Sequence, residues 1–493
     1  MRRTRYQYDL AVIGGGAAGL TAAAGAARFG AKTILMEKKG RLGGDCLHTG
    51  CVPSKALIRA ARVLSLAGRA QGFGLPPLKA EGSVDLGAVM DSVQEVIDAI
   101  QVHDSPERFR SLGAQVLFGS TRFVDDHTVM MDNRRITARA WIIATGSHPA
   151  IPPVAGLDKV PCWTSENLFS QRVLPARLIV LGGGPIGLEM AQAFCRLGSK
   201  VTVVEFMERI LSVEDPAVTG ILHRRLEAEG IEIRTGTRAV KVEHADGTFR
   251  LFTTPAQGNG PESTIEGDAL LVATGRIPAT EGLGLEEAGV AFSARGIPTD
   301  NRMRTNVRHI YACGDCTGRL PFTHAANYEA GVALTNAILH LPRTVDFGRI
   351  GWCTYTDPEV ASIGLNEQRA AEQGVEYRVF EEEFKDNDRA QAERETAGRI
   401  RLLVDRRERL LGCQIIGPHA GELIHDWVVA SSGKVRLSAM AGMVFVYPTL
   451  SEISKRVAGE VYAEKVFGAR TRGLLKLLFG YRGRACPPRG DNC

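Results

Sequence analysis

Two cysteines in the stretch GGDCLHTGCVPSK, residues 43–55, are of types and spacing that could do chemistry. Cys46 and Cys51 are five positions apart, and such a pair can form a structural disulfide, supply metal ligands or work as a redox couple. A regular helix would separate them by about 7.5 Å, whereas a disulfide needs Cα atoms about 4.4–6.8 Å apart. The segment between them must therefore be irregular, which Gly50 permits.

The residues after Cys51 favour a thiolate. From Val52 the chain reads VPSKALIRAARVLSLAGRA, a predicted helix with Pro53 in its first turn. Cys51 then lies at a helix N-terminus and Lys55 adds a positive charge, and both stabilise a thiolate. A disulfide across so short a loop would constrain the chain little, and His48 alone does not complete a zinc site. We favour the redox pair, with the structural disulfide and the metal site as alternatives.

The elements that position this stretch begin with a nucleotide-binding unit at residues 9–37, DLAVIGGGAAGLTAAAGAARFGAKTILME. An apolar strand at 10–13 precedes a G-x-G-x-x-G motif, an alanine-rich helix and a second strand at 33–36. The motif consists of Gly14, Gly16 and Gly19. These glycines allow a tight turn, close approach of a pyrophosphate to a helix N-terminus and close helix packing. Glu37 ends the second strand, where a carboxylate can bind ribose hydroxyls.

Residues 177–205, RLIVLGGGPIGLEMAQAFCRLGSKVTVVE, repeat the same plan. The second motif consists of Gly182, Gly184 and Gly187, and Glu205 ends the second strand. The first glycine and the acid are 23 positions apart in both units. The repetition predicts that the chain binds two nucleotides. Glu205 favours NADH over NADPH because a carboxylate repels a 2′-phosphate, although nearby Arg209 weakens this preference.

The composition is that of an ordinary globular protein. The chain has 493 residues, 44% of them hydrophobic and 23% charged, enough for roughly three or four domains. A net charge of +5 gives no reason to expect nucleic-acid binding. No apolar run approaches the roughly 20 residues that span a bilayer, and the basic start leads directly into a strand. We therefore expect a cytoplasmic location, where most of the ten scattered cysteines stay reduced.

Further motifs lie at 141–149 (WIIATGSHP), 270–278 (LLVATGRIP), 311–318 (YACGDCTG) and 447–452 (YPTLSE). Together with the first glycine motif and GGDCLHTGCVPSK, they make the chain resemble the flavoprotein disulfide reductases. These are the class I pyridine nucleotide-disulfide oxidoreductases, which include dihydrolipoyl dehydrogenase, glutathione reductase and mercuric reductase. The resemblance implies an α/β fold with two Rossmann-like domains, for FAD and NAD, plus an α+β C-terminal dimerisation domain of a homodimer.

The resemblance also implies domain boundaries. We expect an FAD-binding domain in two parts, residues 1–150 and 280–345, with an NAD(P)-binding domain inserted between them at residues 151–279. A dimerisation domain should follow at residues 346–468, and a basic tail at residues 469–493.

The family assigns cofactor contacts to matching positions of this chain. The expected FAD contacts are Gly14, Gly16, Gly19, Glu37, Gly44, Lys55, Thr145, Gly146 and Asp315, and the expected NAD contacts are Gly182, Gly184, Gly187, Glu205 and Gly275. The resemblance implies a relay in which NADH reduces FAD and FAD opens a Cys46–Cys51 disulfide. Cys51 would then face the flavin and Cys46 would meet the acceptor, while Lys55 would pair with Glu189 beside the flavin.

The chain departs from its relatives at one catalytic position. Reductases of organic disulfides carry a histidine, paired with a glutamate, that exchanges protons for the partner subunit. Here the residues are Tyr447 and Glu452, and a tyrosine with an ordinary pKa near 10 is a poor base at neutral pH. Mercuric reductases also carry tyrosine in this region, so we predict Hg(II), held transiently by Cys46 and Cys51, as the acceptor. The alternatives are a dihydrolipoyl dehydrogenase-type disulfide reductase and a flavin redox sensor with little turnover.

Three features stay open. The segment GLLKLLFGYRGR, residues 473–484, fits a helix on a membrane surface or one packed on the dimer, and we favour the packed helix. Cys486 and Cys493 in the tail are either incidental thiols, which we favour, or carriers of a metal ion to the partner's cysteine pair. Asp45 stands where relatives usually have threonine, and the sequence offers no physical reason for it.

Overall fold

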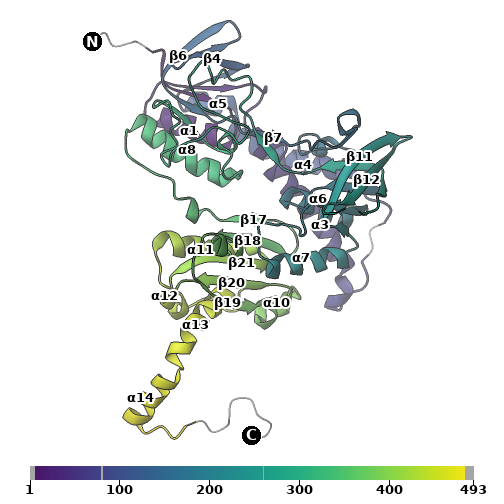
Figure 1. Ribbon diagram of the computed structural model, residues 1–493, viewed down its shortest axis with the longest axis vertical. Coiled ribbons are helices and arrows are strands. Elements are labelled where there is room, and N and C mark those ends of the chain that lie inside the picture. Colours follow the sequence, from purple (N-terminus) through teal and green to yellow (C-terminus); the bar gives the residue numbers. More distant parts are fainter. Residues whose placement is uncertain (1–5, 79–80, 259, 484–493) are drawn as a thin grey trace. The chain divides into compact units, whose positions relative to one another are not determined.

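The computed structural model describes residues 6–78, 81–258 and 260–483, and the chain folds into two compact units (Figure 1). Unit 1 comprises Met1–Ser212 and His223–Phe347, and unit 2 comprises Val213–Leu222 and Gly348–Cys493. The predicted α/β class is confirmed, with a mixed sheet, a parallel sheet, smaller antiparallel sheets and covering helices in unit 1, and an antiparallel sheet with helices in unit 2. None of the described helices is long and apolar enough to cross a membrane.

The first sheet of unit 1 has the strand order β3-β2-β1-β6-β5-β4, with β16 pairing β6. Its strands are β1 (Tyr8–Ile13), β2 (Thr33–Glu37), β3 (Ala114–Phe118), β4 (Thr121–Asp125), β5 (Thr128–Met131), β6 (Arg134–Ile143) and β16 (Ile310–Ala312). Strands β1, β2 and β3 are parallel, and β6 pairs β1 in parallel but β5 antiparallel. The apolar run of β1 is buried, as a central parallel strand requires.

The second sheet of unit 1 is parallel, with the order β10-β9-β8-β14. Its strands are β8 (Arg177–Leu181), β9 (Lys200–Val204), β10 (Glu232–Arg234) and β14 (Ala269–Val272). An antiparallel sheet of β11 (Thr237–Ala245), β12 (Thr248–Pro255) and β13 (Ser263–Gly267) lies beside it. The short strands β7 (Ser147–Pro149) and β15 (Arg276–Pro278) pair antiparallel, and they directly follow the two Ala-Thr-Gly segments.

The helices of unit 1 include those that open each nucleotide-binding unit and those that carry the cysteines. They are α1 (Ala17–Arg28), α2 (Gly44–His48), α3 (Cys51–Gly68), α4 (Leu86–Gln101), α5 (Pro106–Ser111), α6 (Pro185–Leu197) and α8 (Thr323–Ile338). The small residues of α1 are buried, so this helix packs closely on β1 and on α8 (Figure 1). Helix α3 packs on α6, which brings the cysteine segment against the second nucleotide-binding unit.

Unit 2 is built on an antiparallel sheet with the order β17-β18-β21-β20-β19. Its strands are β17 (Trp352–Thr354), β18 (Glu359–Gly364), β19 (Arg378–Glu383), β20 (Arg399–Val404) and β21 (Leu410–Gly417). Its helices are α9 (Glu367–Glu372), α10 (Asp388–Glu393), α11 (Ala420–Gly433), α12 (Leu437–Gly442), α13 (Glu452–Val466) and α14 (Ala469–Phe479). Helix α7 (Pro216–Ala228) begins in unit 2 and ends in unit 1. The core of unit 2 contains Trp427, Phe384 and Ile415, all fully buried.

Candidate active site

The irregular segment between the two cysteines is a break between helices. Cys46 lies in α2, and Cys51 is the first residue of α3. Gly50 joins the two helices, and a Cβ at this position would lie only 2.9 Å from the carbonyl oxygen of Asp45. Cys46 is half-buried, Cys51 is exposed, and neither is in a disulfide in this structure. The break places Cys51 at the N-terminus of α3, where the helix dipole favours a negative charge.

The two thiols differ in protonation. A hydrogen bond from the Cys46 thiol lowers the pKa of Cys51 to about 6, and the Thr323 hydroxyl and the charge of Lys55 act in the same direction. The Thr323 oxygen lies 3.3 Å from the Cys51 sulfur. The hydrogen bond to Cys51, together with burial, raises the pKa of Cys46. At neutral pH Cys51 is therefore the thiolate and Cys46 the thiol. The sequence prediction misses Thr323, because no local pattern signals a contact across 272 positions.

Lys55 joins the cysteine segment to the second nucleotide-binding unit. Its Nζ lies 2.8 Å from Oε2 of Glu189 on α6, and 3.3 Å from the Ser54 hydroxyl. The Glu189 side chain is only 6% exposed, and salt screens a partly buried ion pair of this kind much less than an exposed one. This contact is the pair that the sequence leads us to expect. Lys55 thus lies one turn after Cys51 with its charge fixed in place.

The two glycine motifs have nearly the same geometry. Gly14 has φ +108° and Gly182 has φ +114°, values that L side chains rarely adopt. A Cβ would lie 2.2 Å from the Ala144 carbonyl oxygen at the first position and 2.4 Å from that of Ala273 at the second. Both carbonyls belong to the Ala-Thr-Gly segments, so each motif is held against the strand end that follows its own unit.

The acids that end β2 and follow β9 brace these motifs. Glu37 accepts hydrogen bonds of 2.6 Å from the amides of Gly15 and Lys39. Glu205 accepts bonds of 2.6 Å from the amides of Gly183 and Met207. Each carboxylate therefore fixes its own glycine-rich turn, a role that the sequence does not reveal. Each carboxylate oxygen keeps a second lone pair with which it can accept a hydrogen bond from a ribose hydroxyl.

The backbone around the first motif fits a dinucleotide. Helix α1 starts at Gly16 without a side-chain cap, so the amides of its first turn remain for a ligand. Gly44 lies against Gly16, since a Cβ on Gly44 would be 2.6 Å from the Gly16 Cα. Helix α6 likewise starts at Gly184 without a side-chain cap. Both helix N-termini can thus bind phosphate groups, and the first can hold the pyrophosphate of FAD.

Asp45 has a partner in the structure. Arg276, the first residue of β15, donates a hydrogen bond to Asp45 and one of 2.7 Å to the Ser147 hydroxyl. Ser147 in turn donates to Asp315 at 2.6 Å, and Arg276 lies 3.8 Å from the same carboxylate. Lys39 also lies 3.4 Å from Asp45. The extra carboxylate beside Cys46 is therefore neutralised by Arg276, which joins it to the expected FAD contact Asp315.

The remaining expected cofactor contacts lie at the two strand ends. The Thr145 hydroxyl donates to the Ala279 carbonyl at 2.7 Å, which ties the first Ala-Thr-Gly segment to the chain after β15. Gly146 and Gly275 have φ +74° and +130°, so both turn the chain where it enters β7 and β15. The paired strands thus cross between the two nucleotide-binding sheets.

Replacing the first glycine of each motif is expected to weaken the binding of one nucleotide and leave the binding of the other unchanged. Gly14→Ala should lower FAD affinity more than 100-fold, because its Cβ would collide with Ala144 at a strained φ. Gly182→Ala should retain FAD but raise the KM for NADH to a similar extent. Flavin absorbance per chain and steady-state NADH kinetics measure these effects. Gly331→Ala, in α8, is the matched control, because an added Cβ would meet nothing within 4 Å apart from the backbone of its own helix. If Gly182→Ala loses FAD and Gly14→Ala keeps it, the two assignments must be exchanged.

A buried acid lies beside the predicted FAD contact Asp315. Glu329 on α8 is fully buried and accepts a hydrogen bond of 2.7 Å from the Gly314 amide. Burial raises the pKa of Glu329 to about 7. Its neutral form is therefore favoured in the folded state. The resulting stabilisation is complete below about pH 4.5 and is lost as the pH rises through about 7.

Glu329→Gln is expected to remove this pH dependence, because glutamine resembles the protonated acid. The stability advantage of the variant over the wild type should grow by about 2 kcal/mol between pH 5.5 and pH 8.5. Urea unfolding of the FAD-loaded protein at both values measures it, with the exposed Glu281→Gln as control. An advantage that does not change with pH would show that Glu329 keeps an ordinary pKa.

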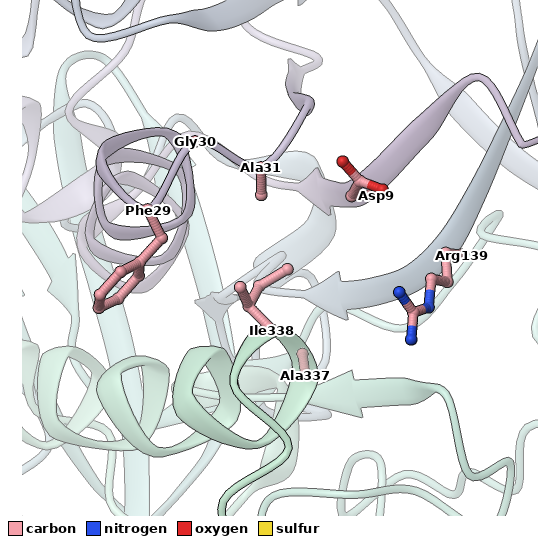
Figure 2. A pocket seen from close by; sticks show the side chains of 7 residues that line it. All are labelled: Asp9, Phe29, Gly30, Ala31, Arg139, Ala337 and Ile338. Carbon is pink, nitrogen blue, oxygen red and sulfur yellow. The ribbon is translucent and has the colours of Figure 1, made fainter.

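The structure also has a pocket of about 220 Å³ whose lining includes none of these residues. Figure 2 shows its side chains. The pocket is lined by Asp9, Phe29, Gly30, Ala31, Arg139, Ala337 and Ile338. Asp9 is near the start of β1, whereas the glycine motif follows the end of that strand. Ligands of parallel α/β sheets bind at the carboxyl ends of the strands. The polar groups also have partners, since Asp9 accepts from the Lys32 amide and Arg139 bonds His340. We therefore assign this pocket no role in catalysis.

Unit 2 contains Tyr447, which the sequence predicts in place of the usual histidine, and the expected glutamate Glu452. The hydroxyl of Tyr447 donates to Asp388 at 3.0 Å, and this hydrogen bond raises the pKa of Tyr447 above its ordinary value. Oε2 of Glu452, the first residue of α13, lies 3.5 Å from the amide of Thr449. Tyr447 in this arrangement holds its proton more firmly than an ordinary tyrosine. Cys486 and Cys493 lie outside the described residues.

Comparison with known proteins agrees with this geometry. Residues 8–330 match the family described as pyridine nucleotide-disulphide oxidoreductase, and residues 350–458 match its dimerisation domain. The mercuric reductase of Staphylococcus aureus is 32% identical over 453 residues, covering 92% of this chain and 82% of that protein. The dihydrolipoyl dehydrogenase of Bacillus subtilis is 33% identical over 456 residues, covering 90% of this chain and 96% of that protein.

A solved structure is also similar. The Cu(II) complex of the HOCl-induced flavoprotein disulfide reductase from Escherichia coli has a TM-score of 0.82 and 25% sequence identity. The match covers 93% of this chain and 100% of the Escherichia coli chain. Members of the matched family depend on FAD and use NAD(P)H, and the dimerisation domain supports a homodimer. The resemblance predicted from the sequence is confirmed, and the chain belongs to the pyridine nucleotide-disulphide oxidoreductases, as an NAD(P)H-dependent flavoprotein oxidoreductase.

Proposed function

We propose that this protein oxidises NADH and passes the electrons through Cys46 and Cys51 to a metal ion that binds thiolates, namely Hg(II). One observation carries the proposal. At the position where disulfide-exchanging relatives need a base, Tyr447 donates its proton to Asp388 and has a raised pKa. Thiol–disulfide exchange with an organic substrate needs proton transfer at neutral pH, whereas Hg(II) binds thiolates without it.

The protein residues supply the thiolates and hold the proton. FAD, which the first glycine motif and Asp315 would hold, would supply the electron pair that connects oxidation of the nicotinamide to reduction of the Cys46–Cys51 disulfide. The disulfide takes up that pair and one proton, which leaves the Cys51 thiolate and the Cys46 thiol, as their unequal pKa values require. Lys55, paired with Glu189, keeps a positive charge near Cys51.

The reduction of Hg(II) balances in atoms and electrons, and it releases two thiols in addition to Hg(0). Hg(II) carrying two thiolate ligands exchanges them for the sulfurs of Cys46 and Cys51, and the two ligands leave as thiols with the Cys46 proton and one proton from solvent. The Cys46–Cys51 disulfide then forms as both Hg–S bonds break, and the electron pair left on the metal reduces Hg(II) to Hg(0). Overall, NADH, one proton and the mercury dithiolate give NAD⁺, Hg(0) and two thiols. The exposed Cys51 and the half-buried Cys46 leave the pair accessible to such an ion. The similar Escherichia coli structure, solved with Cu(II), supports a metal ion as acceptor.

A comparison of acceptors tests the proposal. NADH oxidation is measured with Hg²⁺ in excess thiol, and separately with lipoamide, quinones and oxygen. We expect kcat/KM for Hg(II) to exceed that for lipoamide by at least about 100-fold, the lower end of the contribution of a general base. Tyr447→His should raise lipoamide turnover while leaving Hg(II) reduction within a few-fold. Fast lipoamide turnover by the wild type would instead support the dihydrolipoyl dehydrogenase-type alternative, which the 33% identical Bacillus subtilis relative favours.

We further propose NADH as the preferred donor and the cytoplasm as the location. Glu205 is fixed at the end of the second nucleotide-binding unit by two backbone amides, so its carboxylate cannot turn away from a 2′-phosphate. The ratio of kcat/KM for NADH over NADPH should therefore exceed about 10, and Glu205→Ala should reduce it. Rapid flavin reduction by NADH in a stopped-flow experiment separates an enzyme from a redox sensor.

A further inference from the structure

The last described helix, α14, presents apolar side chains to solvent. Leu474, Leu477 and Leu478 are 54%, 80% and 62% exposed, and no residue of the helix is buried. The spacing i, i+3, i+4 puts these leucines on one face of the helix. Phe479, the last residue of the helix, and Tyr481 just after it are 63% and 59% exposed and add apolar surface at the C-terminal end. A solvent-exposed stripe of this kind needs a covering surface.

The charges of the segment are all positive. Residues 466–483 contain no aspartate or glutamate and four basic residues, Arg470, Arg472, Lys476 and Arg482. Arg472 and Lys476 are four positions apart, on the side of the helix opposite the leucine stripe, whereas Arg470, four positions before Leu474, lies at the N-terminal end of the stripe itself. A basic face beside an apolar face is the pattern of a helix that lies in the headgroup region of a membrane.

Three observations decide between a membrane and a second copy of the chain. The helix lies outside residues 350–458, which match the dimerisation domain. Residue i contacts residue j in a twofold interface, so two copies of α14 meet each other only across the axis, where they would place like charges together. An anionic surface instead complements all four basic side chains. With 11 residues the helix is about 16 Å long, too short to span the roughly 30 Å of a bilayer.

We propose that α14 binds the surface of anionic lipid bilayers, with Leu474, Leu477 and Leu478 inserted among the lipids and the basic residues at the headgroups. The helix lies in the plane of the membrane and attaches the reductase to it peripherally. This inference does not depend on the identity of the electron acceptor.

Sedimentation with vesicles tests the proposal on the full-length, FAD-loaded protein. Vesicles of phosphatidylcholine with 40 mol% phosphatidylglycerol (about this fraction gives a strongly anionic surface) are compared with pure phosphatidylcholine. We expect binding to the anionic vesicles, at least about tenfold weaker binding to the neutral ones, and loss of binding at about 1 M NaCl. The variant R470Q/R472Q/K476Q should bind roughly 100-fold more weakly, since each basic residue near the surface contributes about fivefold.

A matched control removes the same charge elsewhere in unit 2. R406Q/R407Q/R436Q changes exposed arginines outside α14 and should bind like the wild type. L477S/L478S should lose binding while the protein stays dimeric by light scattering. Absent wild-type binding, an equal loss in the control, or unchanged binding by R470Q/R472Q/K476Q would each overturn the proposal. So would dissociation of the L477S/L478S dimer with vesicle binding retained, because α14 would then be a contact between subunits.

Discussion

Cys51→Ala is expected to lower NADH-driven reduction of Hg(II) by at least about 10³-fold, the scale of losing a group that bonds the substrate. The residue is a thiolate at neutral pH because the Cys46 thiol donates to it and because Thr323 and Lys55 stabilise its charge. Cys46→Ala should be as damaging, since it removes the other sulfur and the hydrogen bond that lowers the pKa of Cys51. A single remaining thiol cannot form the disulfide that accepts an electron pair.

The same variants should still bind FAD and oxidise NADH with ferricyanide, which takes electrons without the cysteines. A rise in the ratio of ferricyanide activity to Hg(II) activity therefore shows that the cysteine pair itself is needed for Hg(II) reduction. A general loss of structure would lower both activities together. Cys162→Ala, a half-buried cysteine in another part of unit 1, is the matched control and should keep both activities. Full Hg(II) activity in Cys51→Ala would remove the basis of the proposed function.

Glu214→Ala is expected to destabilise unit 2 by about 3–5 kcal/mol. The carboxylate is 3% exposed and accepts hydrogen bonds from Trp352 Nε1 at 2.6 Å, the Ser362 hydroxyl at 2.7 Å and Gln414 Nε2 at 2.5 Å. Alanine would remove the acceptor that these three donors share. The segment Val213–Leu222 would thereby lose three of its polar contacts with the sheet of unit 2, while Asp215 would keep its bond to Arg401.

Calorimetry of the FAD-loaded protein measures this effect as a fall of about 10 °C in the midpoint of the unit 2 transition. Glu372→Ala provides the control, because Glu372 is an exposed acid that accepts one bond from Gln368. Its midpoint should change by less than about 2 °C. An equal shift for both variants would mean that the polar contacts of Glu214 do not stabilise unit 2.

The parts of the site that the sequence predicts are those built from neighbouring residues. A strand, a glycine turn and a helix follow one another within 30 residues, so the expected strand at 33–36 is close to β2, Thr33–Glu37. The helix expected from Val52 is observed to begin at Cys51. Local spacing also reveals the irregular turn at Gly50, because a regular helix cannot bring the cysteines together.

The parts that the sequence does not predict depend on contacts between distant segments. Thr323 reaches Cys51 across 272 positions, and Arg276 reaches Asp45 across 231. Neither residue type marks its partner, since threonine and arginine are common at exposed positions. The amide contacts of Glu37 and Glu205 are hidden for another reason. The motif predicts that an acid is present, but the orientation of its carboxylate follows only from the folded turn.

The unequal protonation of the two cysteines sets how the reducing power of the pair changes with acidity. Reduction of the disulfide consumes two electrons but only one proton wherever Cys51 is ionised and Cys46 is not, which begins above about pH 6. The midpoint potential of the pair should therefore fall by about 30 mV per pH unit above this value and by about 59 mV per unit below it. As the pH rises, the reducing power of this pair therefore increases only half as steeply as that of a pair in which both thiols stay protonated.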